Sequence, residues 1–494
     1  MARPLLLLHG YSATGLGFNT LRQKLVDRNI DAKLLNVGNY VSLNNEITIR
    51  DIAEGMERAI QMVPELNQAE EFDAIVHSTG MLVVRAWLAH KQLSADPNTR
   101  LTRLKHLIGL APATWGSPQA HKGRTWLGAL VKGNKAPGPD FMNAGDKVLD
   151  GLELGSRFTW DLAHIDLLGE TPYFGTGNNT PYVAVFIGNT AYDGPASVAN
   201  DPGTDGTVRW SGCGLNTRKI TLDLTRRQRN ADGTAPQRVT MTGWAAQERL
   251  DVPILAVEGR DHGTLISNPD EGMVERLVKF LDVGNAQQFT DWLDEAKAWA
   301  EPARQKMLED PGSHAAGLAG SVKKYFGHLF HLTGKRLEGW QQFVIRARDE
   351  HGDPVTDYML QVFRWQDGDW KACEEMYTDV HAYRTDPSFR CIHVRLQEGI
   401  SDPQVPMQIR IKASTGTEIM TYQGYGTDQT EMAMRADSDP VVFDISGGLG
   451  GGSAALFHPF TTTLVEIVLN RVPYPFGKYS DIFQWLKEEA AQKL

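Results

Sequence analysis

Three features that are scarce or absent in this chain of 494 residues limit the classes of protein to which it can belong. It has only three cysteines, which are too few for a disulfide framework. One bridge between Cys373 and Cys391 is conceivable, but free thiols are expected for these two and for Cys213. It has no apolar run long enough to cross a bilayer. Positive charge is not in excess, and the net charge of −10 argues against nucleic acids and anionic membrane surfaces as electrostatic partners.

The N-terminus also lacks the pattern of a secretory signal peptide. Arg3 precedes four leucines, but this run is too short for the apolar core of a signal sequence and is better explained as a strand. We therefore expect a cytoplasmic protein, or one exported without an N-terminal signal peptide. The apolar content of 41% and the charged content of 22% are ordinary for a soluble globular protein. The length exceeds the usual size of one domain.

The most informative segment is Val76-His77-Ser78-Thr79-Gly80, which lies between an apolar run and a second apolar stretch. The order predicts a buried strand, a tight turn with Ser78 at its apex, and then a helix. The helix N-terminus offers backbone N–H groups and partial positive charge to an oxyanion. This arrangement is a nucleophile elbow. Val76 stands where the motif usually has glycine, so the alternative is an ordinary strand whose final turn caps a helix.

A serine nucleophile needs a histidine base and a carboxylate that orients this base. His262 follows an apolar strand predicted at 252–259 and is the candidate base. Asp205 lies in a turn-rich loop after an apolar strand predicted at 181–188 and is the candidate acid. The competing carboxylates are Asp193, Asp201 and Asp261.

The first apolar strand runs into His9-Gly10 and a glycine-containing loop. A serine hydrolase needs a second oxyanion donor from such a loop, in addition to the residue after the nucleophile. The backbone N–H groups of Tyr11 and Thr79 are therefore the candidate oxyanion-hole donors.

Together these segments resemble the α/β-hydrolase superfamily, and within it the bacterial triacylglycerol lipases and the related esterases that deacylate GPI-anchor lipids. His9-Gly10-Tyr11 resembles the lipase oxyanion loop, and residues 107–118 resemble the lipase strand and loop with a proline followed by Gly-Ser. Asp205-Gly206-Thr207-Val208 and Asp261-His262 resemble the acid and base motifs. The resemblance covers about residues 1–285. It implies a serine carboxylic-ester hydrolase (lipase, esterase or phospholipase) that acts on an acyl ester or lipid through a Ser-Asp-His triad and an acyl-enzyme, without a cofactor.

Residues 1–285 are predicted to form an α/β domain with a doubly wound parallel sheet, because short apolar strands alternate with helical stretches. The expected strands are Leu5–Leu8, Ala74–His77, Lys105–Leu110, Tyr182–Ile187 and Pro253–Glu258. Between about 113 and 180 the alternation stops and aromatic residues are frequent, which we interpret as a cap over Ser78. Trp115 and Trp126 are the candidate substrate-binding residues in this cap, although most of its aromatics are expected to form its own core. Residues 219–225 and 238–242 are predicted as a β-hairpin inserted before the last strand.

The remainder predicts a helical connector at 286–335, an all-β sandwich at 336–478 and a C-terminal amphipathic helix at 479–494. The expected strands of the sandwich are Gln342–Arg348, Tyr358–Trp365, Arg390–Leu396, Pro406–Lys412, Glu418–Tyr422, Pro440–Ile445 and Thr462–Leu469. His381, His393 and Cys391 show no metal-ligand spacing and are expected to pack. This domain is expected to bind, orient or shield, and its partner is left open.

Two alternatives to the esterase hypothesis follow from the same residues. In the first, Val76 distorts the elbow and the chain is a non-catalytic binding protein that uses its β-sandwich. In the second, the triad is intact but cleaves an amide or a thioester, because a fold and a triad do not fix the substrate.

The stretch after His262 predicts catalysis without a metal. Many bacterial lipases carry an acidic calcium ligand just beyond the catalytic histidine, whereas this chain has Gly263-Thr264-Leu265-Ile266 there. Calcium prefers several oxygen ligands, and carboxylates above all. We therefore expect ester hydrolysis to survive EDTA. Loss of hydrolysis in EDTA that added calcium restores would contradict this prediction.

Overall fold

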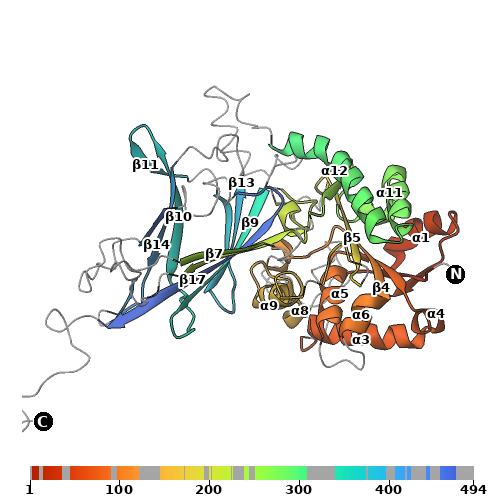
Figure 1. Ribbon diagram of the computed structural model, residues 1–494, viewed down its shortest axis with the longest axis horizontal. Helices are drawn as coiled ribbons and strands as arrows, with labels where there is room; N and C mark the ends of the chain where they lie inside the picture. Colours follow the sequence, from red (N-terminus) through yellow and green to blue (C-terminus); the bar gives the residue numbers. More distant parts are fainter. Residues whose placement is uncertain are drawn as a thin grey trace, which may run out of the picture.

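The computed structural model describes most of the chain in two adjoining parts, an α/β part and a β-rich part (Figure 1). The described residues are 3–10, 15–35, 45–90, 97–121, 145–171, 173–177, 179–193, 200–201, 203–223, 225, 238–243, 251–308, 340–373, 377–395, 406–417, 420–423, 441–444 and 457–473. Within these ranges, no helix combines the length and the apolar content that a bilayer crossing requires.

The α/β part is built on a six-stranded parallel sheet with the order β2-β1-β3-β4-β5-β8. The strands are β1 (Leu5–Leu8), β2 (Ala32–Leu35), β3 (Phe72–His77), β4 (Leu104–Leu110), β5 (Tyr182–Gly188) and β8 (Ile254–Val257). Every residue of β1, β3, β4 and β5 is buried, as the continuous apolar runs predict for a sheet covered on both faces. The edge strand β2 was not predicted, because its short sequence Ala-Lys-Leu-Leu is only half-buried and carries no clear period.

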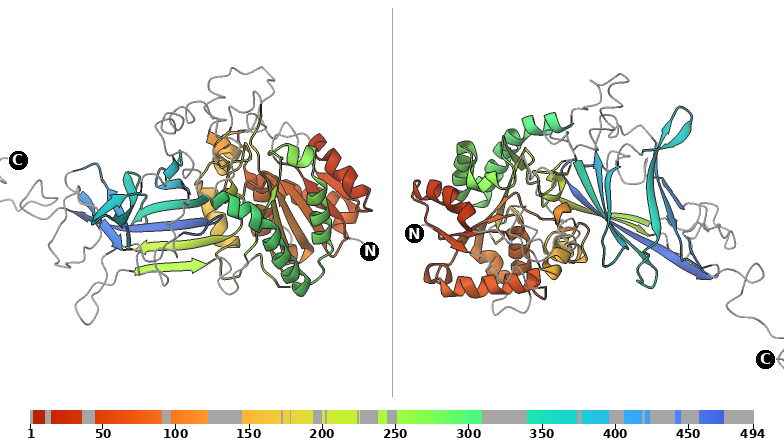
Figure 2. Two further views of the ribbon diagram at one scale, coloured as in Figure 1. Left: turned by 90° about the horizontal axis from the view of Figure 1, so that it is seen from above. Right: turned by 180° about the vertical axis from the view of Figure 1, so that it is seen from behind.

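Helices cover both faces of this sheet (Figure 2). One group contains η1 (Gly15–Phe18), α1 (Asn19–Val26), α10 (Thr264–Ser267) and α11 (Glu271–Leu281), and α12 (Ala286–Leu308) follows them. The other contains α3 (Ile49–Met62), α4 (Pro64–Asn67), α5 (Gly80–Ala89), α6 (Pro97–Arg103), α8 (Asp146–Leu152) and α9 (Arg157–Asp166). Helix α5 is buried along its whole length, and its Arg85 is paired with Asp166 of α9 at 2.7 Å.

The β-rich part consists of two sheets that share one hydrophobic core. The smaller sheet has the order β11-β10-β14-β16, and the larger has the order β12-β13-β9-β17-β6-β7, with β15 paired to β17. A short 3-10 helix, η4 (Trp210–Gly212), precedes the first of these strands. The strands are β6 (Thr217–Asp223), β7 (Arg238–Gly243), β9 (Trp340–Asp349), β10 (Tyr358–Gln366), β11 (Asp369–Ala372), β12 (Tyr377–Ala382), β13 (Phe389–Arg395), β14 (Met407–Ala413), β15 (Met420–Gln423), β16 (Val441–Asp444) and β17 (Thr462–Pro473). Packing of two sheets on a common core agrees with the predicted β-rich C-terminal domain.

The predicted hairpin before the last α/β strand is present as antiparallel β6 and β7, but it does not extend the sheet of the α/β part. Instead, β6 pairs in parallel with β17, which pairs in parallel with β9 on its other side. Strands β6 and β7 therefore belong to the large sheet of the β-rich part, although both lie within the predicted domain 1–285. Local sequence pattern predicts a hairpin, but it does not specify the sheet that the hairpin joins. The predicted helix at 479–494 and the connector beyond 308 lie outside the described residues.

The two parts pack on each other through a continuous core. Val344, Cys391 and Leu464 of the β-rich part are buried in the same cluster as the core of the parallel sheet. Helices α8 and α9 lie between the two parts (Figure 1). Trp160 of α9 meets Phe389 of β13 edge-on with ring centroids 5.6 Å apart. All three cysteines are free and buried, in agreement with the expectation of free thiols.

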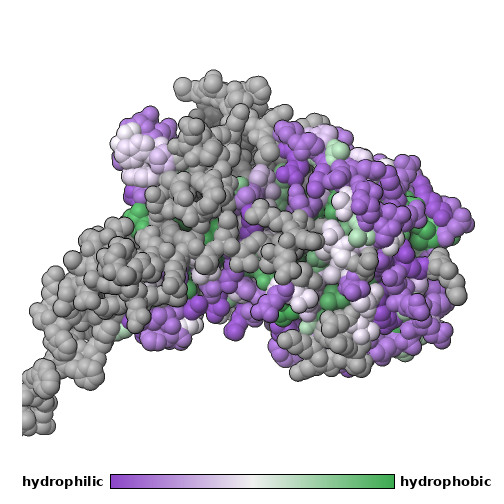
Figure 3. All heavy atoms as spheres, viewed as in Figure 1, coloured by the Kyte–Doolittle hydropathy of each residue, from purple (hydrophilic) through white to green (hydrophobic). Residues whose placement is uncertain are grey.

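The described surface of the α/β part in the view of Figure 3 is mainly hydrophilic.

Candidate active site

Ser78 occupies a strained turn at the carboxyl end of β3. Its φ of 55° lies in the left-handed region that non-glycine residues rarely adopt. The backbone around it is held on both sides: Ser78 N–H donates to the carbonyl of Leu110 at 3.2 Å, and Ala113 N–H donates to the carbonyl of Ser78 at 3.0 Å. Because α5 begins two residues later, the turn has the strand–serine–helix geometry of a nucleophile elbow.

Two glycines give this turn the room that it needs. A Cβ atom at Gly10 would lie 2.9 Å from Ser78 Cβ and 3.1 Å from the carbonyl oxygen of His77. A Cβ atom at Gly80 would lie 3.2 Å from Val76 Cβ and 3.1 Å from the carbonyl oxygen of Leu8. Val76 is fully buried, and the missing side chain at position 80 leaves space for it. The valine that departs from the usual motif therefore does not distort the elbow.

The structure brings two of the predicted site residues into direct contact. His262 Nδ1 and Asp205 Oδ2 are 2.8 Å apart, and the Asp205 side chain is fully buried. The second oxygen, Oδ1, accepts the backbone N–H groups of Thr207 at 3.0 Å and Val208 at 2.8 Å. These bonds fix the carboxylate, so that in a neutral His262 the proton lies on Nδ1 and the lone pair on Nε2.

The loop that carries His262 is held against the end of β5. A Cβ atom at Gly188 would lie only 2.1 Å from the carbonyl oxygen of Arg260, so this close approach requires glycine. His262 N–H also donates to the backbone carbonyl of Asp205 at 2.9 Å.

Asp261, the closest competitor in sequence for the acid, has a different role. Its Oδ1 accepts the N–H groups of Gly263 at 3.0 Å and Thr264 at 2.8 Å, where α10 begins. Asp261 therefore orders the start of a helix. Asp193 is exposed.

His77, which the sequence did not single out, joins the elbow to the base. Its Nε2 lies 2.9 Å from the carbonyl oxygen of His262, and because a carbonyl only accepts, Nε2 carries the proton. The two imidazole rings are 4.5 Å apart, and His9 lies 5.3 Å from the ring of His77 on another side. Burial, together with His262 and His9, lowers the pKa of His77 well below its ordinary value of 6.5. His77, which directly precedes Ser78, is therefore a neutral donor that holds the His262 loop at the elbow.

Of the four remaining predicted site residues, the structure describes Thr79 and Trp115. Thr79 is fully buried and directly precedes α5, so its backbone N–H lies at the start of the helix, close to Gly10. Trp115 is fully buried, and its indole N–H donates to the carbonyl of Gly214 at 3.2 Å, which ties it to the interior. Tyr11 and Trp126 lie outside the described residues, so the roles of both stay predictions.

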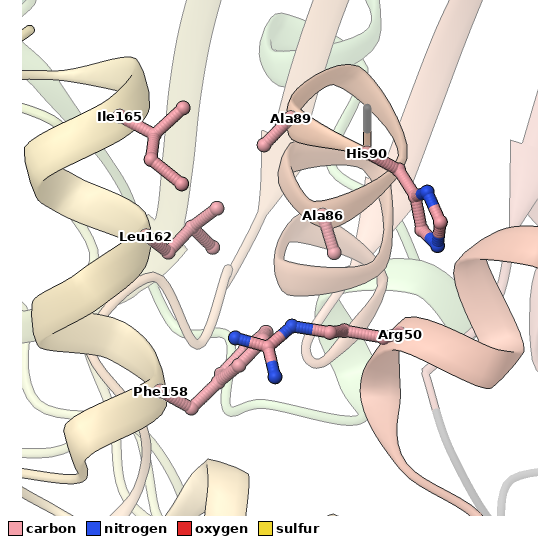
Figure 4. A pocket seen from close by; sticks show the side chains of 7 residues that line it. All are labelled: Arg50, Ala86, Ala89, His90, Phe158, Leu162 and Ile165. Atoms are coloured by element: carbon pink, nitrogen blue, oxygen red, sulfur yellow. The ribbon is translucent and has the colours of Figure 1, made fainter. Parts of the chain in front are cut away.

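One cavity of about 230 Å³ lies between α3, α5 and α9 (Figure 4). Leu162 and Ile165 of α9 face Ala86 and Ala89 across it, and the Arg50 guanidinium covers the Phe158 ring at 5.3 Å. Its α5 residues lie at the end of the helix far from Ser78, because ten residues rise by about 15 Å. This cavity is therefore separate from the site at the elbow.

No protein-family model and no curated protein matches the sequence. Among solved structures, phospholipase PlaB from Legionella pneumophila is 20% identical and matches 99% of this chain and 97% of its own with a TM-score of 0.71. PlaB in complex with thio-NAD matches with the same identity and TM-score over 98% of both chains. This chain has an α/β-hydrolase fold. The likeness to PlaB includes the β-rich C-terminal part, since it spans nearly the whole of both chains.

The neutral state of His77 makes stability sensitive to acid. The unfolded chain takes up a proton on this histidine near pH 6.5, whereas the folded chain does not, so the unfolding free energy falls as the pH drops below 6.5. One such histidine contributes at most about 1.4 kcal/mol per pH unit. Urea denaturation between about pH 7.5 and 5.5 should show a shallower loss for His77→Gln, which can still donate to His262, than for the wild type. His351→Gln, at an exposed site, is the matched control and should keep the wild-type slope. Equal slopes in all three proteins would contradict the assignment.

Proposed function

We propose that this protein is a serine carboxylic-ester hydrolase. The observation that carries the proposal is the contact between His262 Nδ1 and Asp205 Oδ2, together with the hydrogen bond at 2.9 Å that joins the His262 backbone to His77, the residue directly before the strained turn at Ser78. A buried carboxylate that fixes an imidazole tautomer next to a serine in an elbow is the apparatus that makes a hydroxyl nucleophilic. The shared fold with a phospholipase adds support.

In the proposed mechanism, Ser78 Oγ attacks the acyl carbon while His262 Nε2 takes its proton. Asp205 holds the imidazole and stabilises the imidazolium that forms. The N–H groups of Thr79 and Tyr11 stabilise the oxyanion, a contribution of about 2.7–4 kcal/mol for each donor. His262 then protonates the leaving alcohol. Water, activated by the same imidazole, releases the acid from the acyl-enzyme.

For the substrate we propose an acyl ester of a lipid, and a phospholipid in particular. The support is that the fold of a protein named phospholipase matches this chain over both parts and not only over the α/β part. The β-rich part would then help to present the substrate, although its partner is left open. The location, cytoplasmic or exported without a signal peptide, also stays a proposal.

The first test is replacement of the nucleophile. Ser78→Ala should lower the hydrolysis of p-nitrophenyl esters, and of phospholipid in mixed micelles, by several orders of magnitude while the fold is kept. A fluorophosphonate probe should label the wild type and Ser414→Ala, a control in the β-rich part, but not Ser78→Ala. Unchanged turnover in Ser78→Ala would overturn the proposal. Probe labelling without hydrolysis of any ester would favour an amide or thioester substrate, and no labelling at all would favour a binding protein.

A second test concerns the space at the elbow. In Gly10→Ala the new methyl group would press on Ser78 and His77, and the resulting displacement should lower kcat/KM on the order of 100-fold. Gly55→Ala is the matched control, because a Cβ atom there meets nothing within 4 Å. It should retain full activity and gain up to about 1 kcal/mol of stability, since alanine favours the helix. Similar activity in the two variants would show that the elbow tolerates a side chain at position 10.

A further inference from the structure

A cluster of potential metal ligands lies where the two parts of the molecule meet. His121, Glu153 and His381 each offer one ligand atom, and these atoms all lie within 4.8 Å of one another. His381 Nε2 is 2.9 Å from Glu153 Oε1, and the rings of His121 and His381 are 4.9 Å apart in a T-shaped arrangement. The three residues are far apart in the sequence, so that only the folded chain gathers them.

The ligand set fits a divalent transition metal. Two imidazole nitrogens and one carboxylate oxygen suit Zn²⁺, whereas Mg²⁺ and Ca²⁺ prefer oxygen ligands alone. Donors at about 2.0–2.1 Å around a tetrahedral zinc are roughly 3.3 Å apart, so the three side-chain ends need to move by only about 1 Å to close on an ion. The Glu153 side chain is fully buried, and a buried carboxylate is stable only when its charge is compensated.

The positions of these ligands are fixed by the backbone. Glu153 directly follows α8, and its Oε1 also accepts the backbone N–H of Arg384 at 3.0 Å. The segment that carries His121 is joined to the end of α8, because Ser117 N–H donates to the carbonyl of Leu152 at 2.9 Å. Gly116 allows this approach, since a Cβ atom there would meet that carbonyl oxygen at 2.4 Å. A site with such supported ligands is largely preformed.

We propose that His121, Glu153 and His381 bind one Zn²⁺ ion, which fastens the β-rich part to the α/β part. His121 comes from the segment after β4, Glu153 directly follows α8, and His381 comes from β12. A neighbouring contact joins the same two regions: the O–H of Tyr383, directly after β12, donates to Asp150 Oδ2 of α8 at 2.6 Å. The side chain of His381 is 14% exposed, which leaves an approach for the ion from solvent. A neutral His381 that donates from Nε2 to Glu153 would move this proton to Nδ1 when Nε2 binds the ion, so the imidazole stays neutral.

This site is distinct from the proposed catalytic apparatus, but the two are mechanically connected. Ser117, four residues before His121, donates its hydroxyl to the carbonyl of Thr207 at 2.6 Å, and Thr207 N–H in turn donates to the Asp205 carboxylate. No step of ester hydrolysis runs through the cluster. The ion would act by fixing the interface on which the loop of Asp205 rests.

The test is zinc binding by the full-length chain, freed of any histidine tag. Titration calorimetry with zinc chloride should give one site per chain, and the melting temperature should rise with the free zinc concentration. His121→Gln and His381→Gln should each weaken zinc binding on the order of 100-fold or more and abolish the shift in melting temperature. His351→Gln removes an exposed histidine elsewhere and should behave like the wild type. Circular dichroism and hydrolysis of a p-nitrophenyl ester without zinc check that the variants are folded.

Two outcomes would overturn the proposal: no zinc binding by the wild type, or equally tight binding by His121→Gln and His381→Gln. If either variant fails to fold, the wild type loaded with Co²⁺ decides the question. One equivalent of Co²⁺ should give the strong visible absorption of a tetrahedral site without thiolate charge-transfer bands, because the proposed ligands include no cysteine. A weak octahedral spectrum, thiolate bands or no spectrum at all would rule the site out.

Discussion

The structure at the elbow depends on one steric constraint: three backbone segments must meet at closer range than side chains allow. The end of β1, the turn at Ser78 and the start of α5 approach each other where Gly10 and Gly80 have no Cβ atom. Ser78 can hold a φ of 55° only because hydrogen bonds from the neighbouring strand and loop fix its backbone on both sides. The sheet supplies the rigidity that keeps the strained backbone of Ser78 in place. The usual glycine two residues before the serine is dispensable here, because the missing side chain of Gly80 accommodates Val76.

Three buried polar residues near this turn, Asp205, His262 and His77, are linked by hydrogen bonds. Asp205 is satisfied by two backbone N–H groups and His262, and His262 is held from its other side by His77. The low dielectric of the interior keeps His77 neutral, which avoids a second positive charge beside the base when His262 is protonated. A buried charge is also compensated deeper in the core, where the Arg85 guanidinium donates hydrogen bonds to both carboxylate oxygens of Asp166 and to the carbonyl of Thr114.

Much of the fold could be predicted from the sequence, because the strands of the parallel sheet are continuous apolar runs and the motif around Ser78 has a local geometric cause. Asp205 and His262 could be selected by their positions after such strands, and the structure places them in contact. The features that were not predicted depend on contacts between residues that are far apart in the sequence, or on segments with little pattern of their own. The short half-buried strand β2 and the solvent-facing strand β11 show too little hydrophobic pattern to be recognised as strands. The sheet that β6 and β7 join is decided by pairing with β17, which lies more than two hundred residues later in the chain. The cluster of His121, Glu153 and His381 was missed for the same reason, because ligand spacing is visible in a sequence only when the ligands are neighbours.

The place of β17 between β6 and β9 has a consequence for synthesis of the chain. On the ribosome β6 emerges long before its parallel partner, because β6 ends at Asp223 and β17 begins only at Thr462. At about 5–20 residues per second, β6 waits on the order of ten seconds or more with one edge unpaired. An exposed strand edge invites pairing with other chains, so the nascent protein is expected to be a client of chaperones during this interval. The strands of the α/β part can all be synthesised while the β6–β7 hairpin still lacks the neighbour that completes the large sheet.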